Sequence, residues 1–215
     1  MGHFVKICGL ANADDVDAVA ALRPDAMGFV LWPPSKRAVR VEQLAEWTPR
    51  VPTGIRKVGV FVDATPDEVL RAMEQGGLDV AQLHGRERAD DFRKFPRPIW
   101  RAVSLRGDGG AKAQLAPADL AAIDGWSVDA YLVDTYSPSA PGGTGLVGNW
   151  ELARAFVERA DRPVLLAGGL TAGNVREALA AVKPWGADVS SGVERTPGRK
   201  DIEQVREFIK QCRAE

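Results

Sequence analysis

The sequence predicts an α/β fold, a single (β/α)8 TIM barrel of eight parallel strands with helices outside. Three observations lead to this prediction. Short apolar, β-branched runs alternate with helical patterns along the whole chain. An aspartate precedes or enters every second predicted strand. A glycine-rich dinucleotide-binding loop does not follow the first strand, which argues against an open doubly wound sheet. We find no linker, so we expect residues 1–215 to form one barrel domain.

The strands are expected where apolar, β-branched residues run together for four to six positions. The eight predicted strands are Phe4–Ile7, Ala26–Leu31, Lys57–Val62, Val80–Leu83, Ile99–Val103, Ala130–Val133, Val164–Ala167 and Ala187–Ser190.

The helices are expected where apolar residues recur at three- and four-residue spacing. One helix has clear end signals: Thr65 and Glu68 form a capping box, Pro66 suits the first turn, and Gly76-Gly77 supplies the stop. The segments after the second and fifth strands are less regular. The clearest predicted helices are Ala13–Leu22, Pro66–Gln75, Arg86–Phe95, Trp150–Arg159, Asn174–Val182 and Asp201–Cys212.

The aspartates that mark every second strand are Asp25, Asp79, Asp129 and Asp188. Their separations of 54, 50 and 59 residues correspond to about 27 residues for each strand and helix. Eight units of that size fill the chain, as a (β/α)8 barrel requires.

Composition excludes several classes of protein. The chain of 215 residues has 28 basic and 29 acidic residues, so its net charge of −1 argues against a nucleic-acid partner. No apolar run approaches the roughly 20 residues of a membrane span. Two cysteines and two histidines are too few for a disulfide framework or a structural zinc site. We therefore expect a cytoplasmic protein without a metal.

Two reactive side chains are expected at the carboxyl ends of strands, where barrel enzymes place their active sites. Cys8 ends the first strand, and alternation puts it on the same side as Lys6, whose charge favours the thiolate. Asp134 follows the sixth strand, three steps around the ring, so the two groups form a candidate base and acid. The alternatives are a small buried cysteine and an aspartate that caps the next turn.

Anion sites are expected in the loops. Glycine-rich segments follow the sixth, seventh and eighth strands and favour phosphate binding by backbone N–H groups near Gly143, Gly169, Ser191 and Gly192. Arg37, after the second strand, matches a carboxylate, although an exposed arginine is often only solvated. We interpret His84 as a structural histidine, because no acid–base partner stands beside it in the sequence.

Seven motifs together resemble one family. They are Lys6-Ile7-Cys8-Gly9, Gly28-Phe29-Val30 leading into Pro33-Pro34-Ser35-Lys36-Arg37, Gln82-Leu83-His84-Gly85, Asp134, Gly142-Gly143-Thr144-Gly145, Ala167-Gly168-Gly169-Leu170 and Ser190-Ser191-Gly192-Val193-Glu194. In this order and spacing, the chain resembles the phosphoribosylanthranilate isomerases of tryptophan biosynthesis.

The resemblance implies an Amadori rearrangement of N-(5-phosphoribosyl)anthranilate. By similarity, Asp134 is the general acid that opens the ribose ring and Cys8 is the general base at C2. Arg37 binds the anthranilate carboxylate, and Ser191 with the loop glycines holds the phosphate. No cofactor is implied, the partner is this phosphorylated small molecule, and the chain is expected to be a monomer or a homodimer. The alternatives are the related histidine-pathway isomerase, which carries aspartate in place of Cys8, and a catalytically silent phosphate-binding barrel.

Overall fold

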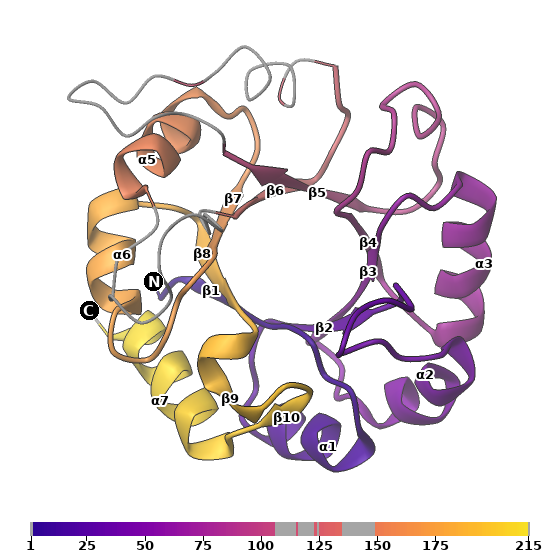
Figure 1. Cartoon of the computed structure of the whole chain (residues 1–215), viewed down its shortest axis with the longest axis horizontal. Coiled ribbons are helices and arrows are strands. Elements are labelled where there is room, and N and C mark those ends of the chain that lie inside the picture. The colour runs from indigo at the N-terminus through magenta and orange to yellow at the C-terminus, as the bar shows by residue number, and fades with distance from the viewer. Residues whose placement is uncertain (1, 106–114, 116–122, 124, 135–148, 215) are drawn as a thin grey trace.

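The eight predicted strands form a closed parallel barrel. The computed structural model describes residues 2–105, 115, 123, 125–134 and 149–214. Each strand pairs with its neighbour in the sequence, and the first strand pairs with the eighth to close the ring (Figure 1). The strands are β1 (Phe4–Ile7), β2 (Ala26–Val30), β3 (Arg56–Phe61), β4 (Val80–Leu83), β5 (Ile99–Ser104), β6 (Ala130–Asp134), β7 (Val164–Ala167) and β8 (Gly186–Val189).

Helices surround the barrel, as predicted (Figure 1). A short antiparallel hairpin, β9 (Glu194–Thr196) with β10 (Arg199–Lys200), follows β8 and precedes the last helix. None of the described helices is long and apolar enough to span a membrane. The helices are α1 (Ala13–Ala21), α2 (Val41–Trp47), α3 (Pro66–Gly76), α5 (Trp150–Arg159), α6 (Val175–Val182) and α7 (Ile202–Arg213), with short 3-10 helices η1 (Thr48–Arg50) and η2 (Ser191–Val193).

The end signals of α3 act as the sequence predicts. The backbone N–H of Glu68 donates to Thr65 Oγ1, and the backbone N–H of Thr65 donates to Glu68 Oε2 at 2.8 Å. Gly77 caps the other end at φ 61°, a left-handed conformation that glycine adopts without strain. The capping box and the glycine stop are therefore confirmed.

One predicted helix is wrong. Residues 86–95 form successive turns closed by bonds such as Asp91 N–H to Arg88 O, not an α-helix. The carboxylate of Glu87 accepts from the backbone N–H groups of Gly85 and Asp63 and from Arg101, so it anchors the segment to the loops after β3 and β4. These tertiary bonds override the local periodicity of the segment.

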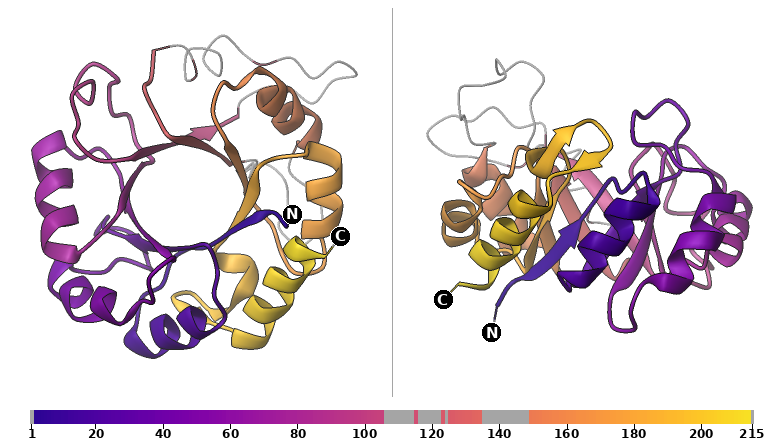
Figure 2. Two further views of the ribbon diagram at one scale, coloured as in Figure 1. Left: turned by 180° about the vertical axis from the view of Figure 1, so that it is seen from behind. Right: turned by 90° about the horizontal axis from the view of Figure 1, so that it is seen from below.

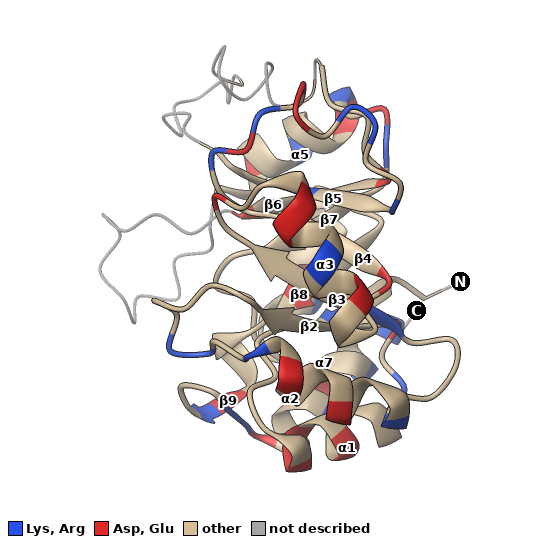
Figure 3. Ribbon diagram, turned by 90° about the vertical axis from the view of Figure 1, so that its right-hand side faces the viewer, with Lys and Arg blue, Asp and Glu red and all other residues tan. Residues whose placement is uncertain are grey.

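The apolar residues form two layers. One layer, between the strands and the helices, is the larger core. The other fills the barrel interior, where Trp100 is 1% exposed and packs edge-on against Phe4. Acidic and basic residues are spread over the helices and loops of the outer surface (Figure 3). The remaining interior residues are Ala26, Val58, Val80, Ala102, Ala130, Leu132, Leu165 and Ala167.

Three of the four repeated aspartates play the same structural role. Asp25, Asp79 and Asp129 each stand just before an even-numbered strand and accept from the backbone N–H of a residue in the preceding strand, at 2.8, 2.8 and 2.9 Å. Each returns its own N–H to the carbonyl oxygen of that residue. Asp188 differs, because it lies inside β8 and bonds to a lysine in the barrel. Trp185 occupies the equivalent position before β8.

The two ends of the barrel differ in what they carry. Both chain termini lie at one end, and the β9–β10 hairpin lies at the opposite end (Figure 2). The strands point their carboxyl ends toward the hairpin, so side chains that follow the strands meet there.

Candidate active site

A cavity of about 490 Å³ opens at the carboxyl ends of the strands. It has the size and position of a small-molecule site in this fold. Gly143 lies outside the described residues. The remaining residues predicted for the site all line the cavity: Cys8, Arg37, Asp134, Gly169, Ser191 and Gly192.

Cys8 directly follows β1, held by its backbone N–H to the carbonyl oxygen of Val189 at 2.8 Å. Lys6 points to the same side of the strand, as the alternation predicts. A Cβ atom at Gly28 on β2 would stand 2.7 Å from Cys8 Sγ and 3.0 Å from Lys6 Nζ. Only glycine at position 28 therefore leaves room for both side chains.

The expectation that Lys6 lowers the pKa of Cys8 is half right. Lys6 is fully buried, and its Nζ donates to Asp188 Oδ1 at 2.7 Å. Burial raises the pKa of the Cys8 thiol; Lys6 acts to lower it, but Asp188 acts to raise it, and the net direction is upward. Burial outweighs the effect of the paired ammonium, so Cys8 is a thiol at neutral pH.

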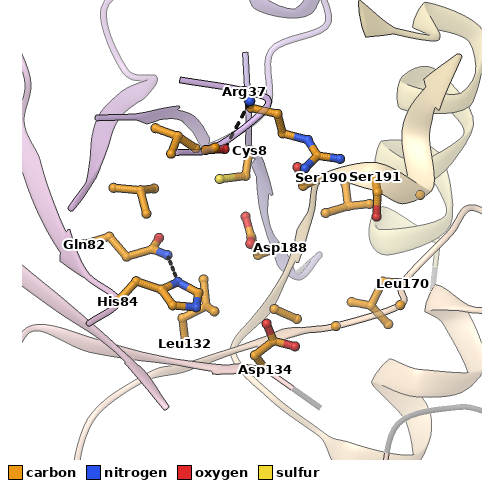
Figure 4. A pocket seen from close by; sticks show the side chains of 18 of the residues that line it. Cys8, Arg37, Gln82, His84, Leu132, Asp134, Leu170, Asp188, Ser190 and Ser191 are labelled. Atoms are coloured by element: carbon orange, nitrogen blue, oxygen red, sulfur yellow. Dashed lines mark hydrogen bonds between the residues drawn. The ribbon is translucent and has the colours of Figure 1, made fainter. Parts of the chain in front are cut away.

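Asp134 ends β6 and lines the cavity on the side opposite Cys8 (Figure 4). The ring order β1, β8, β7, β6 places the two strands three steps apart, as predicted. An acid and a base that face the same cavity are positioned to move two protons on one substrate. Because the residues after Asp134 lie outside the described part of the chain, the turn-cap alternative stays open.

His84 also lines the cavity, next to Gln82 (Figure 4). Its Nδ1 lies 3.5 Å from Gln82 Nε2. Burial lowers the pKa of His84, while Asp134 acts to raise it, so the ring is neutral at neutral pH. The structural interpretation of His84 stays a prediction, although the ring faces the cavity.

Arg37 reaches the cavity rim from the loop after β2, and its guanidinium is already paired. Nε donates to Glu194 Oε1 at 2.7 Å and Nη2 donates to Glu194 Oε2 at 2.6 Å. A Cβ atom at Gly9, where φ is 76°, would stand 2.6 Å from Arg37 Cδ, so glycine lets the arginine lie across the end of β1. Arg37 is thus held in place, unlike an arginine that is merely solvated.

Two glycine-bearing loops form the wall nearest β7 and β8. Gly168 and Gly169 both have positive φ, at 88° and 67°. A Cβ atom at Gly192 would overlap the carbonyl oxygen of Leu170, so the two loops touch only because residue 192 is glycine. The loops bring backbone groups close to one side of the cavity, as an anion site requires.

Four polar residues of this region were not predicted as site residues: Gln82, Asp188, Glu194 and Lys200. Gln82 was visible only as a member of the Gln82-Leu83-His84-Gly85 motif. Asp188 and Glu194 were visible as a repeat member and as the end of a motif, but their partners are 182 and 157 residues away in the sequence. Among the described residues, no group of three or more His, Cys, Asp or Glu side chains is arranged to hold a metal ion.

Comparisons with known proteins identify the family of this chain. The family model for N-(5'-phosphoribosyl)anthranilate isomerase matches residues 5–211. The isomerase of Chromohalobacter salexigens is 42% identical over 96% of this chain and 92% of its own length. That of Thiobacillus denitrificans is 40% identical over the full length of both chains.

Solved structures of this family share the fold. The phosphoribosyl anthranilate isomerase of Thermotoga maritima is 34% identical, with a TM-score of 0.85 over 99% of this chain and 98% of its own. Another such isomerase, solved with reduced 1-(o-carboxyphenylamino)-1-deoxyribulose 5-phosphate, is 32% identical, with a TM-score of 0.81 over the same shares. The chain belongs to the N-(5'-phosphoribosyl)anthranilate isomerase family.

Proposed function

We propose that this chain is an isomerase of tryptophan biosynthesis that converts N-(5-phosphoribosyl)anthranilate into 1-(2-carboxyphenylamino)-1-deoxyribulose 5-phosphate. The observation that carries the proposal is that Cys8 and Asp134 face each other across one cavity. Arg37 on one side of it and the glycine loops on another suit a substrate with an anion at each end.

The first step assigned to the site is ring opening. Asp134 protonates the ribose ring oxygen, the bond from that oxygen to C1 breaks, and the anilino nitrogen supplies electrons to form an iminium ion. Protonation at the leaving oxygen is the contribution of a positioned general acid.

The second step is proton abstraction from C2 by the Cys8 thiolate. The resulting enolamine becomes the ketose by gaining a proton at C1 and losing one from O2. Burial keeps Cys8 protonated before ring opening, whereas the iminium ion formed beside it favours the thiolate, because an opposite charge nearby lowers a thiol pKa. Ring opening thereby activates the base that acts next.

The anions are assigned to opposite walls. Arg37 takes the anthranilate carboxylate through the guanidinium N–H groups that Glu194 does not use. Gly169, Ser191 and Gly192, with Gly143 of the loop after β6, take the phosphate through backbone N–H groups.

The setting we propose is a cytoplasmic monomer or homodimer whose partner is a phosphorylated small molecule, without nucleic acid or membrane. The two described cysteines are both free and buried, which agrees with a reducing compartment. A relative from T. maritima is described as dimeric and has been converted into monomers.

The test is turnover of N-(5-phosphoribosyl)anthranilate, followed by loss of its fluorescence and by mass-spectrometric identity of the product. We expect turnover that inorganic phosphate inhibits competitively. Conversion of only the bisphosphorylated aminoaldose of histidine biosynthesis would replace the proposal by that alternative, and binding without turnover of either substrate would indicate a silent barrel.

A further inference from the structure

We propose that Glu194 and Lys200 are a positioning pair that aims the Arg37 guanidinium and keeps its surroundings positive, so that the site selects an aromatic substrate bearing a carboxylate. This inference rests on the proposed function and assigns roles to two residues of the β9–β10 hairpin.

The first observation is the direction of the guanidinium. Glu194 binds Nε and Nη2 of Arg37 in a bidentate pair, with N···O distances of 2.7 and 2.6 Å. The Glu194 side chain is 4% exposed, so it offers Arg37 a fixed, desolvated partner. A planar guanidinium held along one edge can point its remaining N–H groups in only one direction.

The second observation is the charge balance. Lys200 Nζ donates to Glu194 Oε1 and to the carbonyl oxygen of Ser190, both at 3.0 Å, and its side chain is fully buried. Arg37 and Glu194 alone would be a neutral pair with little attraction for an anion. With Lys200 the three groups carry a net charge of +1, which remains available to a carboxylate.

The third observation is the anchoring of the hairpin. The backbone N–H of Lys200 donates to Asp15 Oδ2 at 2.8 Å, and Asn12 Nδ2 donates to the carbonyl oxygen of Gly198 at 3.2 Å. The start of α1 thus fixes the strand that carries Lys200, which lies opposite Glu194 in the register of the hairpin. The pair is held rigidly enough to direct another side chain.

A purely structural role makes a different prediction. If Glu194 and Lys200 only fasten the hairpin, their loss lowers stability and affects all ligands alike. If they aim Arg37, their loss weakens the binding of a ligand that carries the carboxylate and leaves the binding of a ligand without it nearly unchanged. The ratio of affinities for two ligands that differ in this group separates the two roles.

The experiment measures calorimetric affinities of reduced 1-(o-carboxyphenylamino)-1-deoxyribulose 5-phosphate and of the same compound without its carboxylate. The proteins are the wild type and Glu194→Gln, Lys200→Met and the double variant that combines both changes. The double variant keeps the net charge of +1 but removes the partner that aims Arg37.

The preference is the ratio of the affinities for the compounds with and without the carboxylate. We expect this ratio to fall by about 10- to 100-fold in each variant. Affinity for the other compound should change little. The double variant should lose as much preference as Glu194→Gln does, because keeping the net charge of +1 does not restore the direction of the Arg37 guanidinium.

Arg195→Gln is the matched control. It removes a charge from the same hairpin, where the Arg195 side chain is 66% exposed and pairs with Asp201, and the preference should stay at the wild-type value. Circular dichroism and the melting temperature report folding. If Glu194→Gln is unstable because the buried Lys200 ammonium has lost its carboxylate partner, the double variant, which lacks both charges, still tests the proposal.

An unchanged preference in both Glu194→Gln and the double variant, or an equal loss for the two compounds, would overturn the positioning role. Failure of the wild type to turn over N-(5-phosphoribosyl)anthranilate would instead overturn the proposed function, so the two failures are distinguishable.

Discussion

The two ends of the barrel use polar residues in opposite ways. At the amino end, Asp25, Asp79 and Asp129 repeat one arrangement, in which a carboxylate and a backbone N–H bridge two neighbouring strands. At the carboxyl end, the residues that follow the strands differ from one strand to the next, as Cys8 and Asp134 illustrate.

From this difference we infer which residues serve the fold and which serve the proposed chemistry. A repeated contact stabilises each unit in the same way, so it belongs to stability. A set of unlike groups that converge on one cavity has no repeated structural purpose. We therefore expect changes at the amino end to affect unfolding and changes at the carboxyl end to affect turnover.

The largest effect is expected for the proposed acid and base. Asp134→Asn and Cys8→Ser should each lower kcat by about 10²–10⁴-fold, because each removes a positioned proton-transfer group. Cys8→Asp should retain more activity than Cys8→Ser, since a carboxylate can act as the base. Steady-state kinetics, with circular dichroism for folding, measures these effects.

Cys212→Ser is the control for the thiol, because Cys212 is the other free cysteine and does not line the cavity. It should keep wild-type kcat. Near-normal kcat in a folded Cys8→Ser variant would return Cys8 to the role of a small packing residue.

Arg37→Lys should lower kcat/KM by about 10²-fold, because an ammonium cannot bind Glu194 through two parallel bonds and still face a carboxylate. Lys36→Gln removes an exposed charge from the neighbouring position and should have little effect. Equal losses in the two variants would mean that the loop contributes only general attraction for anions.

Gly192→Ala should raise KM by about tenfold, because the new methyl group displaces the carbonyl oxygen of Leu170 and separates the two proposed phosphate loops. The matched change is Gly173→Ala, whose methyl group would meet only Thr171 Oγ1 at 3.7 Å. Inhibition by inorganic phosphate should weaken in the first variant and not in the second.

The ionisation of Cys8 can be followed by the absorbance of its thiolate, which should be absent at neutral pH and should appear only above the ordinary pKa of a thiol. Burial raises the pKa of Cys212 to about 12, so the thiolate absorbance below that range that is lost in Cys8→Ser belongs to Cys8. An absorbance plateau already at neutral pH would contradict the raised pKa.

The smallest effect is expected at the amino end. Asp79→Ala removes the acceptor for the Lys57 N–H and should lower the free energy of unfolding by about 1 kcal/mol, with kcat unchanged. Asp161→Ala changes an exposed aspartate that makes no hydrogen bond within the described part of the chain, and it should alter neither quantity. A lower kcat in Asp79→Ala would contradict the assignment of the amino end to stability alone.

Sequence patterns predicted the strands well because each strand is encoded locally. β1, β4 and β7 have the predicted limits, β2, β5 and β6 differ by one residue at one end, and β3 and β8 are shifted by one residue at both ends. The helix α2 was not predicted, since its seven residues are fewer than the window over which helical periodicity becomes clear, and residues 86–95 show the reverse error. Local periodicity does not predict the contacts of side chains such as Glu87, which bind backbone groups distant in the sequence.

The candidate site was predictable as a set of positions but not as a network. Position at a strand end was enough to find Cys8 and Asp134. The pairing of Arg37 with Glu194 and that of Lys6 with Asp188 join residues more than 150 positions apart, so no spacing in the sequence encodes them. The upward pKa shift of Cys8 follows from its burial, with a further upward contribution from Asp188, and Lys6 acts against it.

The closure of the ring between β1 and β8 has a consequence for synthesis on the ribosome. Three contacts span this seam: Lys6 with Asp188, Arg37 with Glu194, and the Asp15 carboxylate with the Lys200 N–H. A nascent chain that has not yet emerged beyond residue 187 lacks half of each contact, and closing loops of this length costs conformational entropy before the contacts can offset it. All three contacts therefore exist only after residue 200 has emerged, and we expect shorter nascent chains to have no functioning site.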